Sequence, residues 1–329
     1  MTAPRPGGPA GVSPGVPTVF LGSGEFAVPV LRTLASQPAT HVVGVVTAPP
    51  RPVGRRRVVR RTPVHEAADE LGLPVLTPER LRRPDAIGSV LELGAALAVL
   101  ADYGQLVPPP LLELPYGALN LHPSLLPRHR GASPIPATIL AGDDRTGVTL
   151  MRMDEGLDTG PIVATDIIEL SGSETAPELE RDLAGRAAEL LAATLEPWLR
   201  GERQPTPQPT EGATLTRPLR REDGLLDPRR DAAALERQVR AHAPWPGSFI
   251  ETTAGRTTVL RASVGPAAAT DANMPAGTIV ADGEGIALTT SDGWLILDEV
   301  QPPGGSRMTG AAYRRGHRDI LGSTVVATP

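Results

Sequence analysis

The sequence predicts an α/β fold, in which a Rossmann-like, doubly wound parallel sheet is followed by a smaller C-terminal β-barrel of OB-like type. The first observation is a buried apolar strand at residues 18–21, which runs through a glycine turn into a segment with apolar residues at helical spacing. The second is that strands and helical segments continue to alternate up to about residue 200. The third is a run of five short strands within about 60 residues near the C-terminus.

The N-terminal half alternates apolar strands with helical segments. We expect strands at residues 18–21, 41–47, 74–76, 95–100, 119–122, 148–153 and 162–170, and helices at 25–34, 63–71, 133–141 and 175–201. This alternation favours a parallel sheet, because parallel strands need a crossover connection. Ligands of doubly wound sheets bind beyond the carboxyl ends of the strands. Gly22, Asp102 and His122 follow such ends, so we expect the functional site there.

The domain organisation follows from local composition. The first 17 residues are rich in proline and glycine and lack the apolar core of a signal peptide, so we expect a disordered tail at 1–17. Residues 204–218 are rich in proline and threonine without periodicity, which is typical of a linker. An N-terminal domain at 18–203 and a C-terminal OB-like domain at 219–325 follow. The second domain should hold a helix at 232–241 and strands at 248–251, 257–262, 277–281, 286–289 and 294–300.

Composition excludes several classes of function. The 329 residues are 40% hydrophobic and 21% charged, and no apolar run reaches the roughly 18–20 residues of a membrane span. Cysteine is absent, which excludes disulfides, thiolate metal sites and a cysteine nucleophile; this fits a reducing compartment, and we expect a cytoplasmic protein. Lysine is also absent, which excludes Schiff-base chemistry. No surplus apolar helix face requires a partner, so we expect a monomer.

Two polar residues share one face at the end of a predicted strand. Apolar and polar residues alternate over 119–122, so the side chains of Asn120 and His122 point the same way. Pro123 ends the strand, because proline has no N–H to give to the sheet. Further on, Asp158 lies in a turn-like sequence with glycine on both sides. An amide donor, an imidazole base and a carboxylate that orients it are groups that acyl transfer uses.

Other roles for this stretch compete with acyl transfer. A histidine at a strand end is structural more often than catalytic, so the residues alone leave a structural role of His122 open. No serine or cysteine lies in a nucleophile elbow, which argues against covalent catalysis. His122, His129 and the acids lack the spacing of a zinc site, so we expect no metal.

A basic segment follows the second predicted strand. Residues 51–61 hold six arginines and no acid, although the net charge of the chain is −5. A solvated basic loop and a phosphate-contacting loop both fit this composition, and the residues alone do not separate them.

The stretch around His122 is similar to one protein family. The matching residues are Asn120-Leu121-His122-Pro123-Ser124-Leu125-Leu126-Pro127, Arg130-Gly131-Ala132, Pro134-Ile135, Gly147-Val148-Thr149 and Asp158-Thr159-Gly160-Pro161. In this order they resemble the motifs of the N10-formyltetrahydrofolate-dependent formyltransferases. Further matches lie at residues 22–27, 51–55, 244–246, 277–279 and 301–304, so the resemblance covers about residues 18–312. It is greatest to the members that act on methionyl-tRNA.

The resemblance implies a reaction and a role for each candidate residue. The formyl donor would be the co-substrate 10-formyltetrahydrofolate, and the acceptor the free α-amine of initiator methionyl-tRNA, formylated for translation initiation. Asn120 would donate to the oxyanion, His122 would accept the proton of the amine, and Asp158 would orient His122. Residues that would bind folate are Ser124, Leu125, Leu126, Pro127, Asp102 and Tyr103. Residues that would bind tRNA, together with the C-terminal domain, are Arg51, Arg55, Arg56 and Arg57.

Departures from the family and two alternatives bear on this expectation. The family's basic loop carries lysine as well as arginine, and residues 102–105 read Asp-Tyr-Gly-Gln in place of a more usual Ala-Tyr-Gly-Leu at the wall of the folate pocket. A related enzyme could act on a nucleotide-linked amino sugar or on glycinamide ribonucleotide, but the arginine segment and the barrel argue against it. A non-catalytic RNA-binding protein could keep the same scaffold, but the complete set of Asn120, His122 and Asp158 argues against that.

Overall fold

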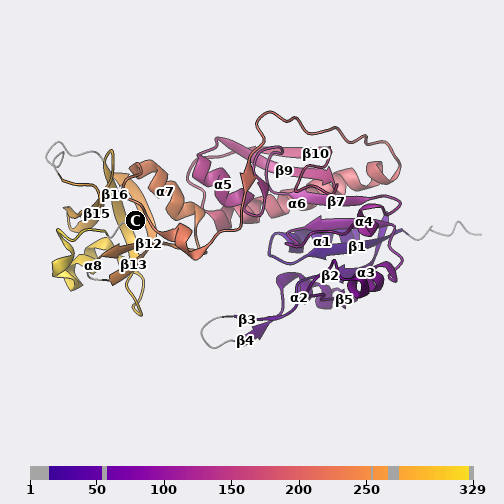
Figure 1. Cartoon of the computed structure of the whole chain (residues 1–329), viewed down its shortest axis with the longest axis horizontal. Coiled ribbons are helices and arrows are strands. Elements are labelled where there is room, and N and C mark those ends of the chain that lie inside the picture. The colour runs from indigo at the N-terminus through magenta and orange to yellow at the C-terminus, as the bar shows by residue number, and fades with distance from the viewer. Residues whose placement is uncertain (1–14, 54–57, 253–254, 266–273, 326–329) are drawn as a thin grey trace, which may run out of the picture. The chain divides into compact units, whose positions relative to one another are not determined.

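The chain forms two compact units, and the computed structural model describes residues 15–53, 58–252, 255–265 and 274–325 (Figure 1). The first unit comprises Met1–His122, Val148–Asp166 and Leu183–Pro209. The second comprises Pro123–Gly147, Ile167–Asp182 and Thr210–Pro329. Over the described ranges, no helix is long and apolar enough to cross a membrane.

A seven-stranded sheet of order β10-β9-β7-β6-β1-β2-β5 holds the strands of the N-terminal half. They are β1 (Val16–Gly22), β2 (Thr40–Val46), β5 (Val75–Leu76), β6 (Leu97–Ala101), β7 (Ala118–His122), β9 (Arg145–Arg152) and β10 (Ile162–Glu169). From β7 through β6, β1 and β2 to β5 the pairing is parallel, which confirms the predicted α/β sheet, whereas β9 runs antiparallel to β7. β1 begins at Val16, so residues 16 and 17 belong to the sheet, and residues 1–14 lie outside the described part of the chain.

Helices cover both faces of this sheet. α1 (Ala27–Ser36) packs on β1, β2 and β6, and α2 (Pro63–Glu70) packs on α1 and β5. α3 (Pro84–Leu91) and α4 (Pro109–Leu112) share a core cluster with alternate residues of β1 and β6, namely Val19, Leu21, Ala98 and Leu100. The buried residues of α1 lie outside that cluster, so α1 covers the opposite face. The strand order reverses between β1 and β6, the point at which doubly wound sheets bind their ligands.

Two helices begin where their sequence signals predict. α5 (Pro134–Ala141) has proline in its first turn, where the missing N–H costs nothing. It ends at Gly142, whose φ of 67° is left-handed. α6 (Ala176–Leu199) follows Thr175, whose backbone N–H donates to the Glu178 carboxylate as a capping box requires.

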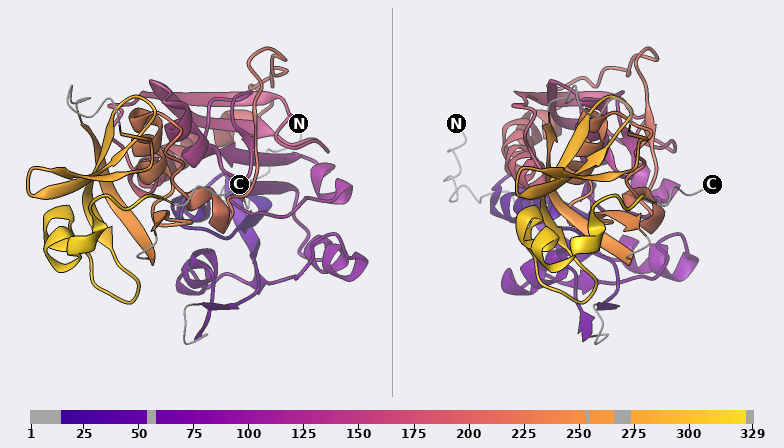
Figure 2. Two further views of the ribbon diagram at one scale, coloured as in Figure 1. Left: turned by 60° about the vertical axis from the view of Figure 1, so that its left-hand side comes forward. Right: turned by 90° about the vertical axis from the view of Figure 1, so that its left-hand side faces the viewer.

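A six-stranded antiparallel sheet forms much of the second unit, in the order β12-β13-β16-β15-β14 with β17 beside β16 (Figure 2). The strands are β12 (Ser248–Thr252), β13 (Gly255–Gly265), β14 (Ile279–Asp282), β15 (Gly285–Thr289), β16 (Trp294–Gln301) and β17 (Met308–Thr309). Val325 bridges to Thr252 in the edge strand β12, and Thr324 bridges to Thr278 just before the other edge strand, β14. This segment joins the two edges, as in the small barrel that the sequence predicts. α7 (Ala232–Ala241) packs on β13 and β16.

Several short elements complete the fold, and the sequence did not reveal them. β3 (Arg51–Val53) and β4 (Val58–Arg60) form an antiparallel hairpin, and β8 (Arg130–Gly131) pairs with β11 (Leu215–Thr216). α8 (Gly310–Gly316) and two 3-10 turns, η1 (Arg221–Gly224) and η2 (Arg318–Ile320), were also missed, as were α3 and α4. Such pieces are too short to show a periodicity. β11 lies within the predicted linker, and the predicted domain boundaries stay a prediction.

Candidate active site

Strand β7 brings Asn120 and His122 to the carboxyl edge of the sheet. It lies between β6 and β9, and its apolar residues Leu119 and Leu121 are buried. His122 is also buried, and Asn120 is half-buried. Asn120 and His122 are two residues apart in a strand, so their side chains leave the same face.

Asp158 lies in a tight turn before β10. Its backbone φ is 53°, in the left-handed region. The Asp154 carboxylate accepts hydrogen bonds from the Gly156 N–H at 3.0 Å and from the Thr159 hydroxyl at 2.8 Å. At Gly160 a Cβ would lie 1.9 Å from the Arg152 carbonyl oxygen, so only glycine fits there. The turn is therefore fixed by its own side chains and by close packing on the end of β9.

Gln208, which lies in a later segment of the chain, also stabilises this turn. Its side-chain amide donates to the carbonyl oxygens of Asp158 at 2.8 Å and of Gly160 at 2.7 Å. Thr206, two residues earlier, exchanges two backbone hydrogen bonds of 2.8 Å with Ile162 at the start of β10. The sequence placed Gln208 in a linker, and no pattern in residues 204–218 could have revealed this contact.

The structure brings His122 and Asp158 together. His122 Nδ1 lies 3.7 Å from Asp158 Oδ2, and the two side chains are 5% and 13% exposed. A carboxylate on the Nδ1 side favours the orientation in which Nε2 meets a substrate. A buried imidazole beside a carboxylate can accept a proton and remain stabilised as the cation.

Asp102 lies at the carboxyl end of β6, next to the glycine turn after β1. The Ser23 N–H donates to the Asp102 carbonyl oxygen at 2.9 Å. A Cβ on Gly24 would lie 1.8 Å from Asp102 Oδ2, so the Asp102 carboxylate occupies the space that a side chain at 24 would need. Asp102 is exposed, with a left-handed φ of 44°. These residues lie where the strand order reverses, which is where a ligand is expected.

Tyr103 and Gln105 connect this edge to the core. Tyr103 is buried in the cluster with Leu100 and Leu111, and burial raises the pKa of its hydroxyl. Among the described residues, none bonds to that hydroxyl. The Gln105 side chain accepts from the Leu81 N–H at 2.8 Å and donates to the Pro78 carbonyl oxygen at 3.3 Å. The glutamine that departs from the family pattern therefore fixes the segment at 78–81.

The loop directly after His122 carries four of the predicted folate-binding residues. Ser124 is fully buried, and its hydroxyl donates to the Arg128 carbonyl oxygen at 2.7 Å. Leu126 is buried, whereas Leu125 and Pro127 are half-exposed. The Ser124 side chain thus stabilises the loop itself, and folate binding by these four residues stays a prediction.

A second histidine–aspartate pair lies in the second unit. His129 Nε2 is 2.7 Å from Asp143 Oδ2, and Arg128 also contacts the Asp143 carboxylate. The backbone N–H of His129 donates to the Thr214 hydroxyl at 2.8 Å. In the sequence, His129 is a candidate only for metal binding, and its spacing argues against that role. Within the described ranges, no group of three or more His, Cys, Asp or Glu residues could hold a metal ion.

One of the predicted tRNA-binding residues, Arg51, lies in the hairpin of β3 and β4. Arg51 is exposed on β3 and pairs opposite Arg60 on β4. Two like charges opposite each other destabilise a hairpin unless an anion lies between them. Arg55, Arg56 and Arg57 lie outside the described residues.

The fold and the site define an α/β enzyme with an imidazole–carboxylate pair beyond the carboxyl ends of its strands. Residues 17–195 match the family described as formyl transferase, and residues 218–318 match the formyl transferase C-terminal domain. The chain belongs to the formyl transferase family, which confirms the resemblance drawn from its motifs.

Two bacterial methionyl-tRNA formyltransferases are similar to nearly the whole chain. That of Gluconacetobacter diazotrophicus is 45% identical over 311 residues, covering 92% of this chain and 97% of the relative. That of Roseiflexus castenholzii is 42% identical over 301 residues, covering 91% of this chain and 96% of the relative.

Solved structures of the same fold are more distant. An N-formyltransferase from Helicobacter canadensis, in complex with folinic acid and dTDP-3-aminofucose, superposes with a TM-score of 0.60. It covers 86% of this chain and 98% of its own, at 16% sequence identity. At that identity the likeness shows the fold alone.

Proposed function

We propose that this formyl transferase moves the formyl group of 10-formyltetrahydrofolate to the free α-amino group of initiator methionyl-tRNA. The product would be N-formylmethionyl-tRNA for translation initiation. The observation that carries the chemistry is the His122–Asp158 pair beside Asn120 at the end of β7. The acceptor is supported by the methionyl-tRNA formyltransferases, which are 42% and 45% identical to the chain over more than nine-tenths of its length.

The reaction exchanges one C–N bond for another. The α-amine nitrogen attacks the formyl carbon, and the formyl oxygen takes the negative charge of a tetrahedral intermediate. The bond from this carbon to N10 of the folate then breaks, and N10 takes up a proton. Because the amine loses one proton and N10 gains one, a single group can serve both transfers.

His122 and Asn120 have the chemistry for the two tasks of this reaction. With Asp158 on the Nδ1 side, His122 Nε2 would accept the amine proton, and the Asp158 charge would stabilise the imidazolium. The side-chain amide of Asn120 would donate to the oxyanion. Loss of one such donor typically lowers the rate by about 10²–10³-fold.

The folate would bind along the ends of β1, β6 and β7. Asp102 and Tyr103 follow β6, where the strand order reverses, and Ser124, Leu125, Leu126 and Pro127 follow β7. That the Helicobacter canadensis enzyme was solved with folinic acid supports a folate as the formyl donor.

The tRNA would contact two basic regions. Arg51, Arg55, Arg56 and Arg57 would bind its phosphates, and the domain at 219–325 would supply further contacts. In this proposal residues 18–203 form the catalytic domain and 204–218 the linker. The cytoplasmic location and the monomeric state stay predictions.

The test is transfer of a labelled formyl group by the purified chain. With 10-formyltetrahydrofolate as donor, methionyl-tRNA should become labelled, while a dTDP-linked amino sugar and glycinamide ribonucleotide should not. Labelling of either small acceptor, with methionyl-tRNA unlabelled, would assign the chain to a different branch of the family. No transfer to any acceptor, with folate still bound, would remove the catalytic assignment.

A further inference from the structure

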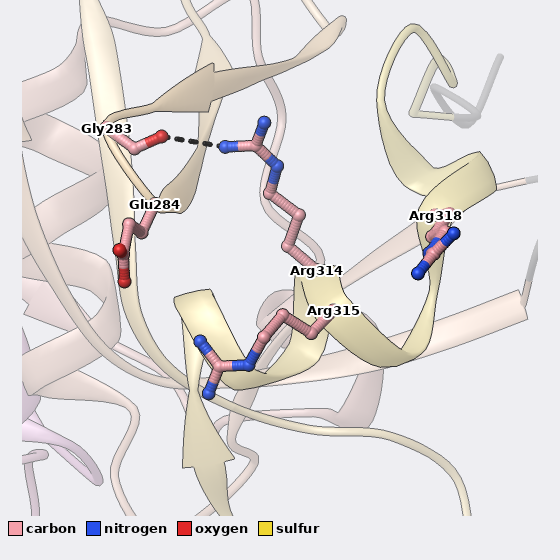
Figure 3. Close-up of a pocket in the computed structure, with 5 residues that line it drawn as sticks. All are labelled: Gly283, Glu284, Arg314, Arg315 and Arg318. Carbon is pink, nitrogen blue, oxygen red and sulfur yellow. Dashed lines mark hydrogen bonds between the residues drawn. The ribbon is translucent and has the colours of Figure 1, made fainter.

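An open, basic hollow lies between α8 and the turn that joins β14 to β15 (Figure 3). It has a volume of about 410 Å³ and is lined by Gly283, Glu284, Arg314, Arg315 and Arg318. Three guanidinium groups thus line the hollow, against the single carboxylate of Glu284. We call this cavity, with Arg314, Arg315 and Arg318 in its wall, the arginine hollow.

The helix that carries two of these arginines is firmly anchored on its other side. Tyr313 is buried, its hydroxyl lies 2.9 Å from the Thr257 hydroxyl, and its ring stacks on His317 with 4.2 Å between centroids. At Gly310 a Cβ would lie 2.3 Å from the Leu297 carbonyl oxygen, so α8 packs directly on β16. With residues 310 and 313 facing inward, the backbone that carries Arg314 and Arg315 is fixed on the outer side of the unit.

The three arginines have different surroundings. Arg314 donates to the carbonyl oxygens of Gly283 at 2.7 Å and Gly285 at 3.4 Å, which fixes the β14–β15 turn. Arg315 and Arg318 are exposed, and across the described residues the side chain of neither forms a hydrogen bond or an ion pair. In contrast, six other arginines in the described part of this unit contact an acidic side chain: Arg128, Arg217, Arg229, Arg240, Arg256 and Arg307.

The structure of α8 explains only part of this concentration of charge. Cations in the last turn of a helix are favourable, because they lie near the negative end of the helix dipole. That accounts for Arg314 and Arg315 but not for Arg318, which lies in the separate turn η2. Guanidinium groups around one hollow repel one another unless an anion neutralises them.

We propose that the arginine hollow binds phosphate groups of the tRNA backbone; the identity of the RNA rests on the proposed function. The planar guanidinium presents N–H donors in a fork that matches two phosphate oxygens. An open hollow with fixed walls can take a phosphodiester that continues on both sides. Glu284 also lines the hollow and repels phosphate, so the attraction for the backbone would come from the arginines.

The test uses the full chain with Arg315→Gln and Arg318→Gln combined, leaving Arg314 to hold its turn. The dissociation constant for deacylated tRNA should rise about tenfold. The slope of log K against log salt should flatten by about two, one for each lost phosphate contact. In the formylation assay KM for methionyl-tRNA should rise, with kcat within about twofold, because neither arginine takes part in the chemistry.

A matched control combines Arg229→Gln with Arg307→Gln. It removes the same charge from the same unit, but both arginines are ion-paired in the native protein. Its tRNA affinity should stay within about twofold of the wild type, because exposed ion pairs contribute little. Equal weakening by both double variants would mean that only net charge matters, and it would overturn the site.

Three further outcomes separate the possible failures. If the wild type formylates methionyl-tRNA while the Arg315/Arg318 variant keeps its affinity and salt slope, the hollow is not a phosphate site and the proposed function stands. If the wild type transfers no formyl group but the variant still loses RNA binding, the hollow stands and the proposed function fails. If inorganic pyrophosphate or an acidic peptide binds through Arg315 and Arg318 while tRNA does not, the RNA assignment is wrong.

Discussion

Among the described residues, two histidine–aspartate pairs have a buried imidazole, and the tighter one is not the one that we place in the reaction. His129 Nε2 lies 2.7 Å from the Asp143 carboxylate, whereas His122 Nδ1 lies 3.7 Å from that of Asp158. A short, well-aligned contact fixes a side chain. A general base must instead take up and release a proton, and its contacts often shorten only when the substrate is bound. In our proposal, the shorter distance therefore does not mark the catalytic pair.

Their surroundings distinguish the pairs better than their lengths do. The Asp143 carboxylate is shared between His129 and Arg128, so it contacts two side chains at once. His122 lies at the end of a strand with Asn120 on the same face. Asp158 lies in a turn that hydrogen bonds from Thr159 to Asp154 and from Gln208 to the Asp158 carbonyl oxygen stabilise. The first arrangement stabilises a loop, and the second presents groups to a ligand.

The largest expected effect comes from replacing each histidine by glutamine. His122→Gln should lower kcat for formyl transfer by about 10²–10⁴-fold, because the proton acceptor is lost. His129→Gln should leave kcat within about threefold. Single-turnover assays at saturating folate and methionyl-tRNA measure both. Near-equal losses in the two variants would remove the distinction between the pairs.

The next effect concerns the Asp158 charge. Asp158→Asn should lower kcat by about 10²-fold, less than the loss in a serine-protease triad, because the contact to His122 is longer than a hydrogen bond. The affinity for tRNA, measured by filter binding, should not change. An unchanged kcat would show that Asp158 does not act on His122.

A smaller effect is expected at Gln208, which we regard as a positioning residue. Gln208→Ala removes both amide donors from the turn of Asp158 and should lower kcat about tenfold with KM unchanged, because a small displacement is enough to misplace a catalytic group. Gln204→Ala is the matched control. Gln204 lies in the same segment, but its amide donates only to the Gly201 carbonyl oxygen. A loss of thermal stability without a loss of kcat would mean that Gln208 is merely structural.

The smallest effect on rate, with a clear effect on stability, is expected at Asp143. Asp143→Asn should lower the free energy of unfolding by about 1–3 kcal/mol, because Arg128 and buried His129 lose a charged partner together. Urea denaturation at pH 7 measures this, and kcat should stay within about threefold. A large loss of kcat in a fully folded variant would place the His129 pair in the reaction.

The sequence predicted those parts of the fold in which apolar residues form a continuous run or follow the period of a helix or strand. The strands β1, β6 and β7 and the helix α7 are apolar runs or amphipathic patterns, and the structure confirms them. The hairpin of β3 and β4 could not be found in this way, because exposed Val58 and Val59 and the surrounding arginines show no buried face.

The candidate site was predictable to a similar extent. Asn120 and His122 follow from strand alternation and a terminating proline. The approach of Asp158 to His122 depends on how β9 and β10 return to the sheet. The contacts of Gln208 depend on a segment that takes its conformation from tertiary hydrogen bonds, and those leave no local pattern in the sequence.

The positive φ of Asp158 has a consequence for anyone who reads this position by deep mutational scanning. Aspartate and asparagine adopt the left-handed region more readily than other side chains with a Cβ. Most substitutions at 158 would therefore distort the turn as well as remove the carboxylate, and a scan would combine two penalties in one fitness score. Asparagine keeps both the backbone geometry and the size of the side chain while it deletes the charge, so its score is the one that reports on the electrostatics of the site.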